Sequence, residues 1–148
     1  MSKRVIVIGA GPGGYVAAIR AAQLGATVTI VEKGNFGGTC LNVGCIPTKV
    51  LLHSAELFSA ITHEGPSIGI FADNVRFDWS VIMKRKATVV RRLTTGVGGL
   101  LRSNAVTHIP GEARIVAPNA VEVAGQRLEA DAIIIATGSV PAMPPIPG

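Results

Sequence analysis

The chain has 148 residues, of which 48% are hydrophobic and 4% aromatic, and its formal net charge is +5. This length corresponds to about one domain, and the apolar fraction is enough for a buried core. No apolar run approaches the roughly 20 residues that a membrane-spanning helix needs, so we expect no membrane segment. The positive charge forms no tail. Several basic residues lie between 84 and 102 on a helix-like segment, which indicates a solvated face rather than a nucleic-acid site.

The N-terminus leads directly into a strand-like run. Met1 to Arg4 precede Val5–Ile8 without the longer apolar region and small-residue cleavage site of a signal peptide, and without a transit-peptide extension. We therefore expect a cytoplasmic protein. In that compartment structural disulfides are rare, and paired thiols are commonly catalytic, redox-sensing or metal-binding.

The first elements indicate a β-α-β unit. Residues 3–8 are an apolar run typical of a buried strand, an Ala-rich helix follows up to Leu24, and Gly25 is a natural helix stop. Residues 27–32 form the second strand. The short loops on either side of the helix predict that the two strands are parallel.

Two further helices are predicted in the middle of the chain. The first covers about 45–61, with Pro47 at an early helical position, and residues 62–74 then read as a loop rich in glycine and proline. Asp78 is positioned to cap a long helix from Trp79 toward Arg102, whose apolar residues recur at helical spacing. Three glycines should weaken the end of this helix.

The last third of the chain reads as short strands. Residues 106–109 form one strand and 131–136 form another, which is buried and parallel. Between them lies a small β-meander with three runs, 113–116, 120–123 and 126–128. We therefore expect an α/β fold with a parallel sheet and a small β-meander insertion. The proline-rich residues 141–148 read as a connector.

A glycine-rich motif lies between the first strand and the first helix. Residues 9–14 read GAGPGG and fit G-x-G-x-x-G. Gly9 permits the tight turn, Gly11 lets the backbone approach a pyrophosphate, and Gly14 lets the helix pack closely on the strand. The helix N-terminus then faces the pyrophosphate with free N–H groups. The predicted contacts of this loop are Gly9, Gly11, Pro12, Gly13 and Gly14.

An acidic residue ends the second strand. Glu32 follows the glycine motif by about 20 residues, where a carboxylate can bind ribose hydroxyls. The alternative is a glycine turn with an unrelated surface glutamate, but strand, glycines, helix, strand and acid in this order favour a dinucleotide site. The unit does not distinguish FAD from NAD. A carboxylate at Glu32 disfavours a 2′-phosphate and therefore NADP.

Both cysteines of the chain, Cys40 and Cys45, lie just after this unit. As a metal site they supply two sulfurs, whereas structural zinc normally has four ligands and the three histidines show no paired spacing; we expect no metal. As a structural disulfide they would close a very short loop and constrain the unfolded chain little. As a redox pair they need a reactive thiolate, access and an electron acceptor. The adjacent helix start and Lys49 add positive potential.

The segment 37–49, GGTCLNVGCIPTK, resembles the active-site loop of the pyridine nucleotide-disulfide oxidoreductases, and within that family its dihydrolipoamide dehydrogenase branch. The resemblance spans essentially the whole chain and implies a Rossmann-like FAD-binding domain. It implies that Cys40 is the interchange thiol, that Cys45 is the charge-transfer thiol beside the flavin, and that Lys49 lies near the reactive nitrogen of the flavin. The further FAD contacts that it implies are Glu32, Lys33, Gly38, Thr39, Gly111, Ala113, Ala136, Thr137, Gly138 and Ser139.

The resemblance also carries expectations about the whole protein. Family members have a second, NAD-binding glycine motif and a C-terminal dimerisation domain with an acid–base His–Glu pair, none of which is in this sequence. Residues 1–148 are therefore expected to be the N-terminal part of an FAD/NAD(P)-binding domain, with 141–148 leading toward the NAD domain. The expected reaction is oxidation of dihydrolipoamide by NAD⁺ through a Cys40–Cys45 disulfide.

The partners implied are lipoyl domains of 2-oxo acid dehydrogenase complexes and a second identical subunit. Two alternatives remain open. One is a glutathione- or mercuric-reductase-like member of the same family. The other, for this stretch of chain alone, is an inactive nucleotide-binding module.

Overall fold

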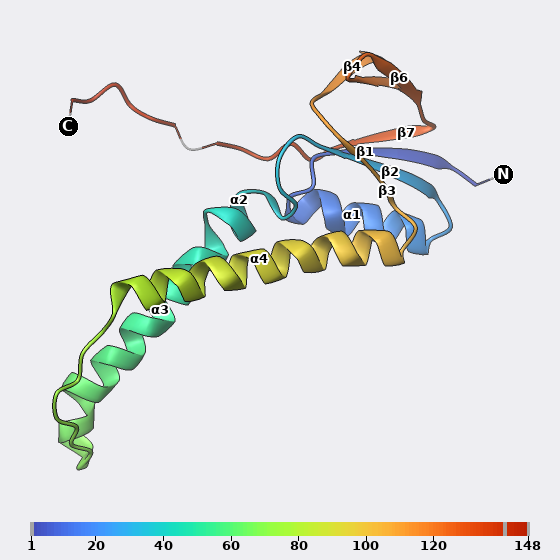
Figure 1. Ribbon diagram of the computed structural model, residues 1–148. Coiled ribbons are helices and arrows are strands. Elements are labelled where there is room, and N and C mark those ends of the chain that lie inside the picture. Colours follow the sequence, from blue (N-terminus) through green and yellow to red (C-terminus); the bar gives the residue numbers. More distant parts are fainter. Residues whose placement is uncertain (1, 141, 148) are drawn as a thin grey trace.

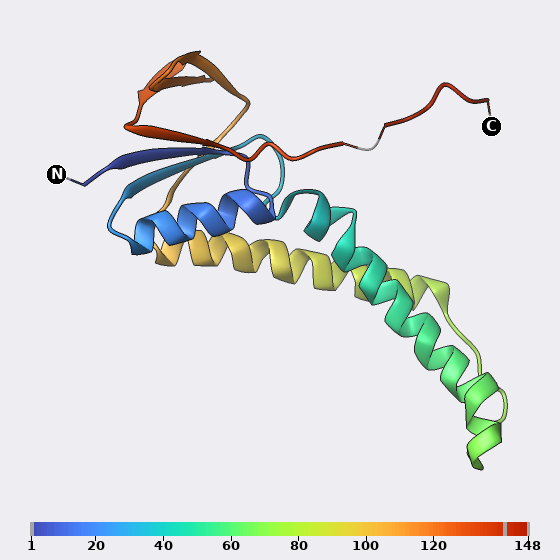
Figure 2. The ribbon, with the colours of Figure 1, turned by 180° about the vertical axis from the view of Figure 1, so that it is seen from behind.

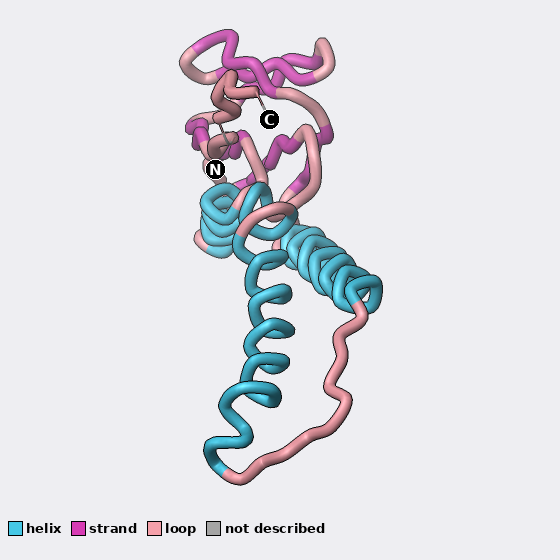
Figure 3. Tube along the Cα trace, turned by 90° about the vertical axis from the view of Figure 1, so that its left-hand side faces the viewer, coloured by secondary structure: helices cyan, strands magenta, loops and turns pink. Residues whose placement is uncertain are grey.

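The computed structural model describes residues 2–140 and 142–147, which form three layers (Figures 1 and 3). A β-meander lies over one face of a parallel sheet, and two helices, α1 and α4, lie against the other face (Figure 1). The strands are β1 Arg4–Ile8, β2 Thr27–Glu32, β3 Thr107–Pro110, β4 Ala113–Ala117, β5 Ala120–Val123, β6 Gln126–Glu129 and β7 Ala132–Ile135. The helices are α1 Pro12–Gln23, α2 Gly38–Asn42, α3 Cys45–Ser59, η1 Ala60–Glu64, η2 Gly65–Ile68 and α4 Trp79–Ser103.

The larger sheet has the strand order β3-β2-β1-β7, and each neighbouring pair is parallel. Val7 of β1 is in register with Ile30 on one side and Ile134 on the other. The smaller sheet, β4-β5-β6, is antiparallel. The expected α/β fold, with a parallel sheet and a β-meander insertion, is therefore confirmed.

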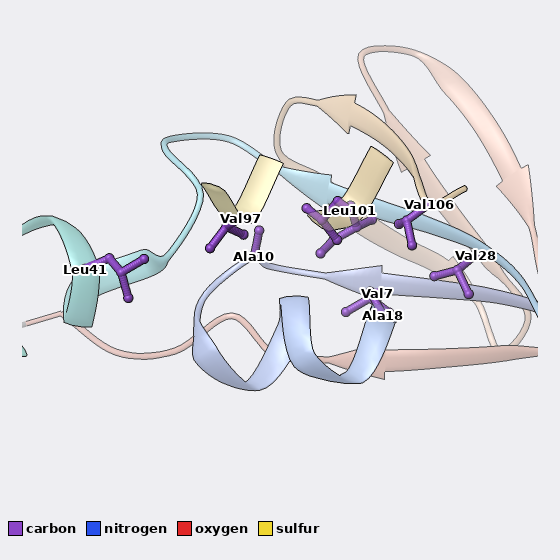
Figure 4. Close-up of a cluster of buried hydrophobic side chains, with 9 residues drawn as sticks. Val7, Ala10, Ala18, Val28, Leu41, Val97, Leu101 and Val106 are labelled. Carbon is purple, nitrogen blue, oxygen red and sulfur yellow. The ribbon is translucent and has the colours of Figure 1, made fainter. Parts of the chain in front are cut away.

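The unbroken apolar run of β1 is explained by burial on both faces of the sheet. Val7 points to the helical side, where it joins a cluster with Val28 and Leu101 (Figure 4). Ile6 and Ile8 point to the other side and pack with a second cluster that includes Val121 of the meander. A strand covered on both faces has no polar positions to alternate with, so it reads as a continuous hydrophobic segment.

Helix α4 begins at its predicted cap and continues past its glycines. The Asp78 carboxylate accepts hydrogen bonds from the Ser80 hydroxyl at 2.6 Å and from the Val81 N–H at 3.1 Å, and these bonds hold the pKa of Asp78 below its usual value. The helix runs unbroken through its three glycines to Ser103. Gly98 is buried, and a Cβ there would lie 3.2 Å from the ring of Phe36, so this glycine allows α4 to pack closely.

Residues 62–68 differ from the predicted loop, whereas 69–74 form neither helix nor strand, as predicted. The α-helical geometry of α3 ends at Ser59, and the chain continues as a π-helical turn, η1, and a 3₁₀ turn, η2. The Thr62 hydroxyl donates to the Phe58 carbonyl at 2.8 Å, which supports the wide turn. Pro66 stands in the first turn of η2, where a missing N–H has no cost. A proline therefore starts a short helix here instead of preventing one.

The outer ends of α3 and α4 extend away from the sheet, as Figure 2 shows from behind. We call residues 51–85 the helical arm. Three of its aromatic side chains are largely exposed: Phe71 is 78%, Phe77 66% and Trp79 58% exposed. None of the helices in the described residues is both long and apolar enough to cross a membrane.

The C-terminal segment runs away from the sheet (Figure 1). Residues 142–147 are exposed and form neither helix nor strand. Pro141 and Gly148, which belong to the predicted connector, lie outside the described residues. The assignment of 141–148 as a connector, and of the chain as part of a larger domain, stays a prediction.

Candidate functional site

The carboxyl ends of the four parallel strands meet at one edge of the sheet, where α/β proteins bind their ligands. A pocket of about 210 Å³ opens at this edge. Six of its lining residues were predicted cofactor contacts, and they come from all four strand ends: Gly9, Glu32, Lys33, Gly111, Ala113 and Thr137. Glu112, between the predicted contacts Gly111 and Ala113, lines it as well. Ile8 and Val31 also line it and were not predicted.

The glycines of residues 9–14 are needed for close backbone packing. Gly9 has a φ of +98°, and a Cβ there would overlap the carbonyl group of Ala136. A Cβ on Gly14 would overlap the Gly9 carbonyl oxygen. Gly11 faces Gly38, where a Cβ would approach the Gly11 Cα to 2.8 Å. The Gly14 contact joins helix to strand, as the motif predicts. The Gly9 contact joins the end of β1 to the residue after β7, and the third brings the cysteine segment against the glycine loop.

The start of α1 offers unpaired amide groups. Gly11 is the N-cap residue, Pro12 stands in the first turn, and within the described residues no side chain hydrogen-bonds to this end and no acid lies in the first turn. The first N–H groups of a helix have no partner inside the helix, and the helix dipole adds partial positive charge. This end of the 12-residue helix is therefore suited to an anion such as a pyrophosphate.

Glu32 lines the pocket, but both of its carboxylate oxygens are engaged by the backbone. Oε2 accepts from the Ala10 N–H and Oε1 from the Gly34 N–H, each at 2.7 Å. The sequence predicted a ribose ligand at this position and gave no sign of these two bonds. At the rim, Lys33 Nζ lies 3.1 Å from Glu112 Oε1, and both side chains are largely exposed.

The two cysteines lie together at the junction of α2 and α3. Cys40 is half-buried on α2 against the core, and Cys45 is the exposed first residue of α3; both are free thiols. A hydrogen bond with the Cys45 thiol, supported by desolvation, raises the pKa of Cys40, while Lys49 acts weakly in the opposite direction. The two thiols are thus close enough for Cys45 to influence the ionisation of Cys40. Among the described residues, no group of three or more His, Cys, Asp or Glu side chains gathers to hold a metal.

Helix α2 was not predicted, because its five residues are fixed by contacts rather than by a periodic pattern. Gly37 precedes it in the left-handed conformation, with a φ of 92°. The Asn42 side-chain amide donates to the carbonyls of Phe36 at 3.0 Å and Gly38 at 2.9 Å. The asparagine between the cysteines was the one sequence signal, since this side chain commonly hydrogen-bonds nearby backbone.

The cysteine segment is attached to the glycine loop and to the segment that follows β7. The Gly37 N–H donates to the Ala10 carbonyl at 2.8 Å, and the Thr39 hydroxyl donates to the Ser139 carbonyl at 3.4 Å. The structure therefore brings the predicted contacts Gly38, Thr39 and Ser139 between the pocket and the thiols, although none of them lines the pocket. Ala136 packs behind Gly9, Gly138 is exposed with a φ of +71°, and Lys49 is exposed on α3, one turn after Cys45.

The chain matches a family model described as pyridine nucleotide-disulphide oxidoreductase over residues 3–148. Among curated proteins, dihydrolipoyl dehydrogenases from Staphylococcus aureus and Geobacillus stearothermophilus are each 52% identical over 140 residues, covering 92% of this chain and 30% of the relative. The dihydrolipoyl dehydrogenase of Acholeplasma laidlawii is 50% identical over 151 residues, covering 100% of this chain and 45% of the relative.

Among solved structures, the chain is similar to the HOCl-induced flavoprotein disulfide reductase RclA from Escherichia coli, with a TM-score of 0.80 and 30% identity over 98% of this chain and 30% of that one. A Cu(II) complex of the same protein gives a TM-score of 0.79 and 29% identity. The sequence thus spans about 30% of the length of most of these relatives.

Proposed function

The chain belongs to the pyridine nucleotide-disulphide oxidoreductase family, and from this premise we propose that it is the FAD-binding N-terminal part of a dihydrolipoyl dehydrogenase. The observation that carries the proposal is a pair of neighbouring cysteines, Cys40 on α2 and Cys45 at the start of α3, on a segment whose Gly37 N–H donates to Ala10 of the dinucleotide loop. In the full-length protein the proposed reaction converts dihydrolipoamide and NAD⁺ to lipoamide and NADH.

The residues present fit FAD. The pocket, at about 210 Å³, is smaller than the roughly 300–1,000 Å³ of ligand pockets in general, so it suits only the nucleoside end of a dinucleotide. Glu32, Lys33 and the 111–113 backbone would hold that end. The N–H groups at the start of α1 would hold the pyrophosphate, and Gly38, Thr39 and 136–139 would line the way to the cysteines. When bound, FAD supplies two-electron transfer between the dithiol and a nicotinamide.

The two cysteines would divide the thiol chemistry between them. From the oxidised pair, a thiolate of the substrate attacks the Cys40 sulfur and displaces the Cys45 thiolate. The second substrate thiolate then attacks its own mixed disulfide and releases Cys40, so the substrate leaves oxidised by two electrons and the pair is reduced. The raised pKa of Cys40 favours its protonated form in the reduced pair at neutral pH.

The wider context follows the relatives. We propose a cytoplasmic enzyme that forms a homodimer and accepts lipoyl domains as substrate, since the curated relatives are dihydrolipoyl dehydrogenases. For the 148 residues alone we propose nucleotide binding without turnover, because they correspond to about 30% of those relatives.

The test is to measure dihydrolipoamide oxidation by NAD⁺ in the full-length protein, with and without Cys40→Ser. The substitution should lower the turnover rate by at least about a thousandfold while flavin absorption stays unchanged. Glutathione disulfide and mercuric ion serve as competing substrates with NADPH. Faster turnover of either one would replace dihydrolipoamide in the proposal, and a protein that purifies without flavin and does not take up FAD would refute it.

A further inference from the structure

Glu32 is the meeting point of three backbone segments. Its Oε2 accepts from Ala10 N–H and its Oε1 from Gly34 N–H, each at 2.7 Å, and its main-chain carbonyl accepts from Gly111 N–H at 3.0 Å. The three donors belong to the glycine loop, to the turn after β2 and to the turn after β3. All three segments border the pocket, so Glu32 connects the backbone segments that surround it.

The connection continues to the thiols through Ala10. The N–H of Ala10 is held by Glu32, and the Gly37 N–H donates to its carbonyl at 2.8 Å, directly before α2. Ala10 itself is fully buried. Short bonds from amide to carboxylate are charge-assisted and stronger than bonds between neutral groups. Removal of the carboxylate would therefore free both the glycine loop and the segment that leads to Cys40.

The two backbone bonds occupy only part of the hydrogen-bond accepting capacity of the Glu32 carboxylate. An ionised carboxylate has about four lone-pair sites, so two remain for hydroxyl donors in the pocket. We propose that Glu32 is a positioning residue that holds the glycine loop in its nucleotide-binding shape before the nucleotide arrives. The proposal rests on the proposed function for the identity of the ligand, whereas the bonds themselves join groups of this chain alone.

A residue that serves only as a ribose ligand would behave differently. Its loss would leave the nucleotide-free loop unchanged and would speed dissociation of the nucleotide. Loss of a positioning residue loosens the empty loop. Because only the fraction of molecules with a competent loop can bind, the association rate then falls.

The first experiment is amide hydrogen exchange on the nucleotide-free protein with Glu32→Gln. A glutamine at this position presents an NH₂ group to one of the two amide donors, so one bond is replaced by a clash of donors. Exchange at Ala10 and Gly34 should be at least about tenfold faster, while the core of β1 stays protected. Glu112→Gln is the matched control, since it removes the same charge at the same pocket without a bond to the loop, and it should leave Ala10 exchange unchanged.

Glu32→Asp is the second variant, in case Glu32→Gln does not fold. It retains the charge but is one methylene shorter and cannot reach both amides. It should also speed exchange at one or both of them. Unchanged exchange in a folded Glu32 variant overturns the proposal.

The second experiment measures FAD binding by stopped flow. Both Glu32 variants should lower the association rate more than they raise the dissociation rate. A change confined to dissociation would identify a ribose ligand and overturn the positioning role. If the unmodified protein binds no FAD, the proposed function fails, and the exchange result still decides what Glu32 does to the loop.

Discussion

The nucleotide edge of the sheet and the helical arm, residues 51–85, differ in how their side chains are covered. At the edge, the important groups are backbone atoms and buried aliphatic residues, and Val7 and Ala10 are fully buried. On the arm, Phe58 and Phe77 meet edge to face at 5.7 Å, but Phe77 remains 66% exposed. The side chains at the sheet edge are therefore covered by other residues of the described chain, whereas those on the arm are not. Substitutions should therefore have large effects at the first region and small ones at the second.

The strongest challenge to this contrast is Gly14→Ala. The new Cβ would overlap the Gly9 carbonyl oxygen, so α1 must move away from β1, and we expect a loss of about 3 kcal/mol in the free energy of unfolding. Urea denaturation of the nucleotide-free protein measures it. Gly13→Ala is the matched control on the same helix, because a Cβ there meets nothing within 4 Å. Equal losses for the two variants would show that the tight strand–helix contact does not matter.

The next effect is expected from Asn42→Ala. This change leaves the carbonyls of Phe36 and Gly38 without their side-chain donor, and both bonds are partly buried. We expect a loss of about 1–2 kcal/mol, measured by urea denaturation. Alkylation of Cys40 should also become faster, because α2 is held less firmly. A stable variant with unchanged thiol reactivity would mean that α2 is fixed by its other contacts alone.

A smaller effect concerns the thiols. Cys45→Ala removes the hydrogen bond that contributes most to the raised pKa of Cys40, so that pKa should fall toward its ordinary value. The alkylation rate of Cys40 follows its thiolate fraction, and the whole pH–rate profile should therefore move to lower pH. Iodoacetamide labelling followed by mass spectrometry measures it. An unchanged profile would show that burial rather than Cys45 raises the pKa of Cys40, and a profile that moves to higher pH would show that Cys45 lowers it.

The smallest effect is expected on the arm. Phe71→Ser replaces a side chain that is 78% exposed, so the free energy of unfolding should change by no more than about 0.5 kcal/mol. The same urea titration used for Gly14→Ala checks it on the same scale. A loss of more than about 2 kcal/mol would place the arm with the sheet edge and end the contrast between them.

The regular parts of the fold could be read from the sequence because their patterns are local. Residues 27–32 and 120–123 form strands with the predicted bounds, and both segments are rich in the valine, isoleucine and threonine residues that favour strands or in apolar residues that pack on the sheet. Helix α2 was not predicted because it depends on the hydrogen bond between Gly37 and Ala10, which are 27 residues apart in the sequence. The helical turns η1 and η2 were not predicted because glycine and proline usually indicate a loop, although they can also begin a short helix.

The site divides in the same way. The glycine motif, the acid at 32 and the turn at 111 lie at one edge of the sheet, because parallel strands bring their carboxyl ends together, and their roles as cofactor contacts stay predictions. The hydrogen bonds from Glu32 to Ala10 and Gly34 could not be read from the sequence, since they depend on the path of the backbone between two strands.

The peptide group of Ala10, held at its N–H by Glu32 and at its carbonyl by Gly37, has a consequence for how this protein can vary. The residues between those two partners form a connection whose ends are both fixed, while Gly34 and Asn35 are exposed. Other residue types can therefore stand at positions 34 and 35, but the number of residues between Glu32 and Gly37 cannot change. A one-residue insertion or deletion at 33–36 would separate the glycine loop from the cysteines, so homologous sequences should preserve this spacing more strictly than the residues that fill it.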